Sequence, residues 1–311
     1  MSPSIMAAGV FSHKKYGENY HALTLVAPGI GAQIEPGQFI NVSCGPNRDF
    51  ILRRPFSVFR VHEQGGAPST IEIVFDLRGP GTRQLAALHI HDKIDVMGPL
   101  GVGFSIPQRR ANCLLVGGGV GAAPLFFLAD RLRKDGHRID AVLGARNADL
   151  LLNAMDLRRM ASVCNLTTED GSAGTTGRVT DVLPDTMDQC GTEVVYACGP
   201  DPMLAAVAQI CVEKKVFVQV AVEELMACGY GVCMTCVMPL RERRSKGANA
   251  GRSVVYARTC TEGPVFNGAQ VIWSSGHEHV ARDQSELSLG GGAVRAGLQP
   301  EAGAGHAPPG N

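Results

Sequence analysis

The sequence lacks a net charge and lacks any long apolar run. Its 29 basic residues balance 29 acidic ones, so there is no overall cationic field to hold nucleic acid or an acidic membrane surface. A run of about 20 consecutive apolar residues, which a membrane-spanning helix needs, does not occur, and the start of the chain lacks the basic and apolar regions of a signal peptide. We therefore expect a cytoplasmic globular protein with no membrane span and no nucleic-acid partner.

The first part of the chain has the pattern of an antiparallel β structure. Short β-rich runs alternate with turn residues, at Ala22–Ala27, Gln38–Ser43, Phe56–Val61, Thr70–Leu77 and Lys93–Met97. Several short strands at this spacing are typical of a barrel or a sandwich. We predict a β-barrel domain over residues 1–108.

The pattern changes near residue 109 to alternating strands and helices, which predicts a parallel sheet with crossover helices over residues 109–222. Residues 223–275 form a short Gly- and Cys-rich segment, too small and polar to build its own core. The Gly/Pro-rich residues 276–311 show no apolar period, so we predict a disordered tail. The fold class expected is thus β plus α/β, with a small third segment.

Four cysteines form the most specific motif. Cys228, Cys233 and Cys236 lie within nine residues, and 23 residues separate Cys236 from Cys260. This is the plant-type spacing of a [2Fe-2S] cluster, in which a loop presents three thiolates and a distant fourth completes the ligation. Two alternatives stay open: a structural zinc ion on four thiolates, and buried thiols without a ligand. Zinc sites usually have closely paired ligands on both sides, so the spacing favours the cluster.

A second motif consists of Gly117, Gly118, Gly119 and Gly121, between the apolar run Cys113–Val116 and a predicted helix. Glycines there let the backbone approach a pyrophosphate at a helix N-terminus. The next predicted strand ends at Arg146 without the acidic residue that usually binds a ribose, so we expect a nucleotide site of a different layout. The alternative is that these glycines only permit close helix packing.

The third motif joins the run Arg54–Ser57 to the loop Gly79–Thr82, which precedes a helical stretch. An arginine and the free N–H groups of a helix start suit the diphosphate of a flavin nucleotide. Taken alone, Arg54 would be read as a solvated surface charge.

Together, Arg54–Ser57, Gly98–Phe104, the triple-glycine turn and Cys198–Met203 resemble the ferredoxin-reductase-like flavoproteins. In these, a flavin-binding barrel is paired with a nicotinamide-binding α/β domain. The segments Glu223–Gly229 and Arg258–Phe266 resemble the electron-transfer subunits of dihydroorotate dehydrogenases. The resemblance covers about residues 14–272.

The resemblance implies three sets of site residues and no catalytic residue acting on an organic substrate. FAD would be held by Arg54, Pro55, Phe56, Ser57, Val74, Phe75, Asp76, Gly81 and Thr82. The nicotinamide nucleotide, with NAD as substrate, would be held by Gly117, Gly118, Gly119, Gly121, Cys198 and Gly199. The metal ligands would be Cys228, Cys233, Cys236 and Cys260.

A partner chain is implied as well. Nicotinamides exchange two electrons and an iron–sulfur cluster passes one, so a chain with both sites needs a flavin, which can do either. The resemblance implies an FMN-containing dihydroorotate dehydrogenase catalytic subunit, in a heterotetramer, whose electrons reach NAD⁺ through the cluster and FAD. The alternatives are a subunit of an NADH-dependent ferredoxin:NADP⁺ oxidoreductase or a sulfide dehydrogenase, and a zinc-stabilised nucleotide-binding regulator without turnover.

Overall fold

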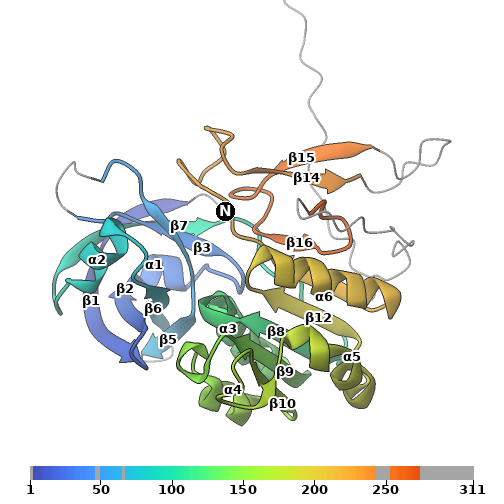
Figure 1. Cartoon of the computed structure of the whole chain (residues 1–311). Helices are drawn as coiled ribbons and strands as arrows, with labels where there is room; N and C mark the ends of the chain where they lie inside the picture. Colours follow the sequence, from blue (N-terminus) through green and yellow to red (C-terminus); the bar gives the residue numbers. More distant parts are fainter. Residues whose placement is uncertain (1–2, 46–49, 65–66, 243–252, 274–311) are drawn as a thin grey trace, which may run out of the picture.

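The protein was studied as a computed structural model that describes residues 3–45, 50–64, 67–242 and 253–273. The predicted disordered tail, 276–311, and most of the charged run 241–246 lie outside the described residues. The described part consists of two seven-stranded sheets and a two-stranded sheet (Figure 1). None of the described helices has both the length and the apolar character needed to traverse a bilayer.

The first sheet is antiparallel, in the order β4-β3-β7-β1-β2-β6-β5. Its strands are β1 (Ser4–Tyr16), β2 (Tyr20–Val26), β3 (Phe39–Val42), β4 (Arg54–Ser57), β5 (Arg60–Gln64), β6 (Ala67–Asp76) and β7 (Lys93–Leu100), with helices α1 (Pro28–Gly31) and α2 (Pro80–Ala86). Only Val58 and Phe59 separate the two edge strands, β4 and β5. So short a connection brings the two edges together, which bends the sheet into the predicted barrel.

Strands β2 and β6 of the barrel have buried side chains on both of their faces. Leu23 and Leu25 of β2 and Ile71 and Ile73 of β6 are fully buried in the barrel interior. Side chains alternate along a strand, so Ala22 and Val74 point the other way and pack against the second sheet. The near-continuous burial of β2 follows from these two contacts.

The second sheet is parallel except at one edge, in the order β11-β10-β9-β8-β12-β13-β16. Its strands are β8 (Asn112–Gly118), β9 (Arg138–Ala145), β10 (Cys164–Thr168), β11 (Thr175–Thr176), β12 (Val194–Cys198), β13 (Phe217–Ala221) and β16 (Val265–Asn267). The helical elements are η1 (Gly119–Ala122), α3 (Ala123–Lys134), η2 (Ala148–Leu150), α4 (Ala154–Met160), α5 (Val179–Cys190) and α6 (Asp201–Glu213). Strand order reverses beside β8, where ligands bind in such sheets.

The segment after residue 222 packs on both larger units. Its hairpin, β14 (Val237–Arg241) and β15 (Val254–Arg258), places Met238 and Ala257 in one core with α6 and β13. Cys236 and Cys260 are buried against Phe39, Met97 and Leu100 of the barrel. The segment, which was expected to be too small and polar to build its own core, packs into the cores of both neighbouring units.

Phe126 holds the two large units together. This α3 side chain is fully buried, and its ring centroid lies 4.8 Å from that of Phe59 in the barrel. The Arg60 guanidinium lies over both rings and pairs with Asp130 at 3.6 Å and Asp156 at 3.1 Å.

We expect Phe126→Ala to lower the free energy of unfolding by about 3 to 5 kcal/mol, because it leaves a cavity between the units. Urea denaturation followed by far-UV circular dichroism measures this. Ile51→Ala, at a side chain that is 91% exposed, is the control and should cost less than about 0.5 kcal/mol. Equal costs for the two variants would contradict the role given to Phe126.

Candidate functional site

Arg54 lies against the first turn of α2. A Cβ on Gly81 would lie 3.4 Å from the Nε atom of Arg54 and 3.2 Å from the Sγ atom of Cys44, so only glycine fits there without displacing its neighbours. The Arg54 Nη1 group donates to the Leu52 carbonyl at 2.9 Å. The structure thus brings a cation and the N–H groups of a helix start together, as a diphosphate requires.

The loop before α2 is ordered by Thr82. Its hydroxyl oxygen accepts hydrogen bonds from the backbone N–H of Arg78 at 3.0 Å and of Gly79 at 3.2 Å. The hydroxyl donates in turn to the Gly79 carbonyl at 3.2 Å. Thr82 therefore shapes the loop that presents Gly81.

The other predicted flavin residues lie on β4 and at the end of β6. Pro55, Phe56 and Ser57 are half-buried on β4, and the ring centroids of Phe56 and Phe75 lie 5.6 Å apart. Val74 and Phe75 are buried in opposite faces of β6. Asp76 is partly exposed and is bound by the Arg78 guanidinium at 2.9 Å. Of the three β6 residues, Asp76 is the one whose side chain reaches the surface.

The glycine turn meets the end of β12. A Cβ on Gly121 would lie 2.7 Å from the Cα atom of Gly199, and one on Gly118 would lie 2.7 Å from the Sδ atom of Met203. Gly119 has a φ of +54°, in the left-handed region that favours glycine. The residues Gly117–Gly121 and Cys198–Gly199 therefore form one backbone surface, at the carboxyl ends of β8 and β12.

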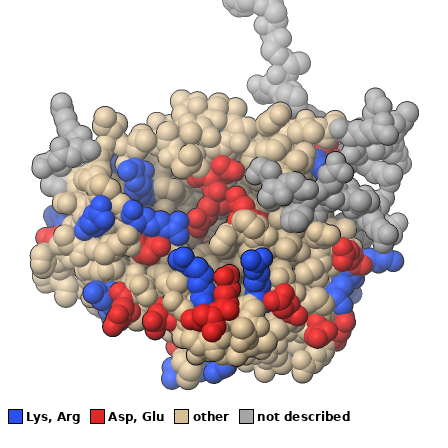
Figure 2. Space-filling view, in the orientation of Figure 1, with Lys and Arg blue, Asp and Glu red and all other residues tan. Residues whose placement is uncertain are grey.

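Acidic side chains gather in the middle of the face of the molecule that Figure 2 shows. Glu223 is exposed along the chain that leaves β13, but protein atoms crowd its carboxyl group, and this burial raises its pKa. Asp201 and Asp76 raise this pKa further, and Arg78 opposes them. Burial, and then the charge of Glu223, raises the pKa of the Cys198 thiol. Cys198 is therefore a neutral thiol.

Tyr20 is buried beside the glycine turn and links the barrel to the second sheet. Its hydroxyl donates to the Leu150 carbonyl at 2.9 Å and would lie 3.8 Å from a Cβ on Gly119. Burial, and next the charge of Asp76, raises the pKa of Tyr20 to about 12, so it remains a hydrogen-bond donor. Nothing in the sequence singles out Tyr20, and Glu223 is visible there only within the segment Glu223–Gly229 that carries the family resemblance.

The four predicted metal ligands lie in two pairs. Cys228 forms a side-chain hydrogen bond with Cys233, and Cys236 with Cys260, and the charge of Cys228 also acts on Cys260, so the two pairs are neighbours. Among the described residues, no three Cys, His, Asp or Glu side chains gather as a single metal ion would need. A two-iron cluster takes two protein ligands on each iron, whereas one zinc ion needs all four to converge. The paired arrangement fits a [2Fe-2S] cluster.

The backbone of the cysteine loop also fits a cluster. The N–H groups of Val232 and Cys233 both donate to the Cys228 sulfur, at 3.4 Å. Hydrogen bonds from the Thr235 side chain and backbone lower the pKa of Cys233 to about 6, which favours the thiolate that binds metal. The Thr259 N–H donates to the Cys236 carbonyl at 2.9 Å and links the loop to the end of β15.

Asn41 attaches this loop to the barrel. The residue is 1% exposed on β3, and its Nδ2 group donates to the Cys228 carbonyl at 3.2 Å. In the β3–β4 pairing Asn41 lies opposite Pro55, the residue after Arg54. The cysteine loop is therefore one strand away from the predicted flavin strand. No sequence motif marks Asn41, because its role depends on a contact across 187 residues.

Fold and site define an oxidoreductase of the ferredoxin-reductase type with an added iron–sulfur segment. Residues 115–209 match the oxidoreductase NAD-binding domain, and residues 223–272 match the iron–sulfur cluster binding domain of dihydroorotate dehydrogenase B. A solved structure described as NADH-dependent reduced ferredoxin-NADP oxidoreductase is similar at 28% identity, with a TM-score of 0.71, over 91% of this chain and 96% of that one. The ferredoxin reductase of carbazole 1,9a-dioxygenase, 20% identical with a TM-score of 0.58 over 70% of this chain and 67% of that one, shares the fold.

Curated relatives identify the family. The dihydroorotate dehydrogenase B (NAD(+)) electron transfer subunit of Shouchella clausii is 36% identical over 76% of this chain and 86% of its own length. That of Geobacillus kaustophilus is 35% identical over 85% and 96%. The chain belongs to the family of dihydroorotate dehydrogenase B electron transfer subunits, whose cofactors are FAD and a [2Fe-2S] cluster, with NAD as substrate. As an electron transfer subunit, it works with a catalytic partner.

We expect Gly229→Ala to displace the cysteine loop. Gly229 has a φ of +77°, and an added Cβ would lie 1.9 Å from the Asn41 Nδ2 atom. Loss of the Asn41 bond and of this backbone conformation should cost about 1 to 3 kcal/mol and expose the loop to protease. Limited proteolysis with mass spectrometry reads this out. Gly9→Ala, where a Cβ meets nothing within 4 Å, is the control, and equal protease resistance of both variants would refute the expectation.

Proposed function

We propose that each set of site residues binds a different group. Arg54 and the loop before α2 bind the FAD diphosphate, β4 and the end of β6 line the flavin, and the surface formed by Gly117–Gly121 and Cys198–Gly199 binds NAD. Cys228, Cys233, Cys236 and Cys260 hold the cluster. The close packing of Gly81 on Arg54 and of Gly121 on Gly199 supports this division, because it brings the residues of each predicted surface together.

The chain passes electrons from an FMN-containing subunit that oxidises dihydroorotate to NAD⁺, in pyrimidine biosynthesis. The observation that carries this proposal is the Asn41 contact, which places the cysteine loop beside the flavin strand. When bound, FAD supplies the exchange between single electrons and hydride. The chain's own residues contribute positioning: the Tyr20 hydroxyl, which donates to the Leu150 carbonyl, links the barrel to the second sheet beside the glycine turn.

The surface around the cysteine loop supports a docked partner. Leu225 is 83% exposed, Val232 is 72% exposed, and Tyr230 and Met234 are also exposed. Large apolar side chains gathered on one surface mark an interaction site. We place the FMN-containing subunit on this face, in a cytoplasmic heterotetramer, so that electrons enter at the cluster.

The structural likeness at 28% identity favours a second candidate, a subunit of an NADH-dependent ferredoxin:NADP⁺ oxidoreductase. Co-purification from the native host distinguishes the two. A partner that contains FMN and oxidises dihydroorotate supports the first function, and a partner that exchanges electrons between ferredoxin and NADP⁺ supports the second.

We predict that Arg54→Ala weakens FAD binding by about ten- to a hundredfold, because it removes a charge-assisted contact of roughly 1.5 to 3 kcal/mol. Equilibrium dialysis of the flavin measures the change. Arg53→Ala is the matched control, because it removes a neighbouring guanidinium that forms an ion pair with Asp95. The assignment fails if both variants retain FAD equally on dilution.

Replacing Cys233 by Ala separates the two halves of the electron path. The cluster's absorbance, its EPR signal and electron transfer from the partner to NAD⁺ should all be lost, because three thiolates rarely retain the centre. NADH oxidation by a dye that accepts electrons from FAD should continue, with FAD occupancy measured beside the rate. Cys164→Ala, on β10, is the control. Full turnover with the partner in a variant without a cluster would refute the path.

A further inference from the structure

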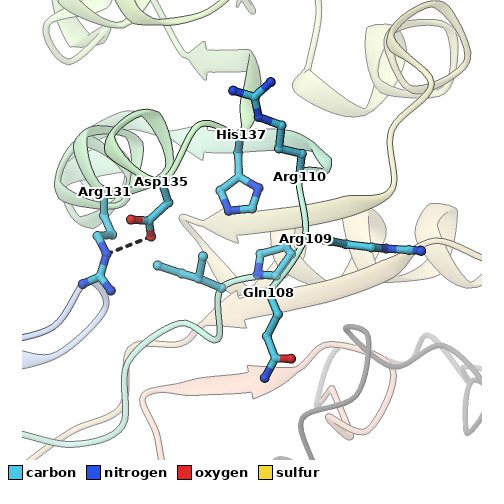
Figure 3. Close-up of a pocket in the computed structure, with 8 residues that line it drawn as sticks. Gln108, Arg109, Arg110, Arg131, Asp135 and His137 are labelled. Atoms are coloured by element: carbon cyan, nitrogen blue, oxygen red, sulfur yellow. Dashed lines mark hydrogen bonds and ion pairs between the residues drawn. The ribbon is translucent and has the colours of Figure 1, made fainter.

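A pocket at the connection between the two large units has charged side chains that do not converge (Figure 3). The guanidinium groups of Arg109 and Arg110 point away from each other and from His137, and Arg131 is paired with Asp135 at 2.9 Å. A buried polar atom without a partner is a more specific sign of a bound group, because leaving such an atom unpaired costs free energy. An atom of this kind lies beside the cysteine loop.

The hydroxyl oxygen of Thr261 is buried and has no hydrogen-bond partner within the described part of the chain. Thr261 follows Cys260, one of the four predicted metal ligands. Both residues lie in a turn that is closed by hydrogen bonds from the N–H groups of Thr261 and Glu262 to the Arg258 carbonyl, at 3.1 and 2.8 Å. The turn thus uses the backbone N–H of Thr261, whereas the hydroxyl keeps a proton to donate.

The Thr261 side chain packs against the cysteine loop. A Cβ added to Gly231, which lies between Cys228 and Cys233, would lie 2.8 Å from the Thr261 Cγ2 atom and 3.6 Å from its Oγ1 atom. Burial raises the pKa of the Cys260 thiol, and the Gly231 N–H opposes this rise, so the same glycine also faces the Cys260 sulfur. The free hydroxyl therefore lies at the contact between the cysteine loop and the turn that carries the fourth ligand.

Arg258 holds this contact in place. Its Nη1 group donates to the Gly231 carbonyl at 3.1 Å, and its Nη2 group pairs with Glu262 at 3.0 Å. The guanidinium thus links the cysteine loop to the turn with Cys260, and it has protein acceptors of its own. Thr261 is therefore held against the loop, and its hydroxyl remains available to a group that the cysteines bind.

We propose that the Thr261 hydroxyl donates a hydrogen bond to the sulfur atoms of the bound cluster and thereby raises the reduction potential of the cluster. Reduction adds negative charge, which a donor stabilises, and hydrogen bonds to the sulfurs are among the factors that set the potential. The inference rests on the ligand set of the proposed function and adds a residue that the cysteine spacing does not mark.

The test is a redox titration of the complete protein, with FAD and cluster in place, followed through the EPR signal of the reduced cluster. Thr261→Val keeps the side-chain shape without the hydroxyl, and Thr261→Ser keeps the hydroxyl. We expect Thr261→Val to make reduction about tenfold less favourable, a decrease of about 59 mV for one electron, and Thr261→Ser to retain the original potential. Thr192→Val is the matched control and should change nothing. The Thr192 hydroxyl is also buried without a partner in the described residues, but it lies before β12, at the end opposite Cys198.

Failure of the ligand set and failure of this inference give different results. If the unmodified protein shows no cluster signal, the ligand set is wrong and the inference falls with it. If the cluster is present, an unchanged potential in Thr261→Val overturns the inference alone. An equal decrease in Thr261→Ser does the same, because the effect would then come from packing.

A variant that does not retain the cluster also decides the question. Iron and sulfide analysis reports the cluster content, and Thr261→Ala, which removes the hydroxyl without crowding the loop, replaces Thr261→Val in the titration if only the latter is empty. Loss of the cluster from both variants but not from Thr261→Ser supports the hydroxyl as its donor. Loss from Thr261→Ser as well overturns the inference.

Discussion

The contact between Phe59, Phe126 and Arg60 is the constraint on which the rest of the molecule depends. The surface proposed for flavin belongs to the barrel and the surface proposed for the nicotinamide nucleotide belongs to the parallel sheet, so on this proposal neither unit contains a complete site. Two tilted aromatic rings in contact, with an interplanar angle of 45°, and a guanidinium paired with Asp130 and Asp156 fix the units against each other. The Tyr20–Leu150 and Arg131–Glu35 contacts add to this junction on either side.

The iron–sulfur segment is also positioned by contacts with both larger units. It has little core of its own, and it gains order by packing Cys236 and Cys260 on the barrel and Met238 on the parallel sheet. The Asn41 contact then fixes the loop beside β4. One-electron carriers need short, constant separations rather than a large binding surface, and a loop held at both ends meets that need.

The sequence predicted the two fold classes, their order and the cofactors, because glycine turns and cysteine spacing carry local chemistry. Elements without such a signal were missed. The long strand β1 has mixed burial, so its apolar residues do not alternate regularly, and α5 contains Pro184, which argues against a helix. The run Phe56–Val61 was expected as one strand, but it is divided between β4 and β5, where the barrel closes.

Residues near the proposed sites that lie outside the motifs were also missed, because they have no local sequence signal. Asn41, Tyr20 and Glu223 act through contacts between distant parts of the chain, with Asn41 and Cys228 separated by 187 positions. A single sequence contains no trace of such proximity. The boundaries at residues 108 and 222 stay predictions, and the structure adds that β16, from beyond residue 222, pairs with β13 of the preceding unit.

That pairing has a consequence for solubility. Without β16, the N–H and C=O groups of β13 would form an open edge, and Val218 and Val220 are among its side chains. Such an edge is a template for adding strands from other molecules. The antiparallel strand Val265–Asn267 covers it with only three residues. The segment that carries the cluster therefore also covers the β13 edge of the nucleotide-binding sheet and prevents strands of other molecules from adding to it.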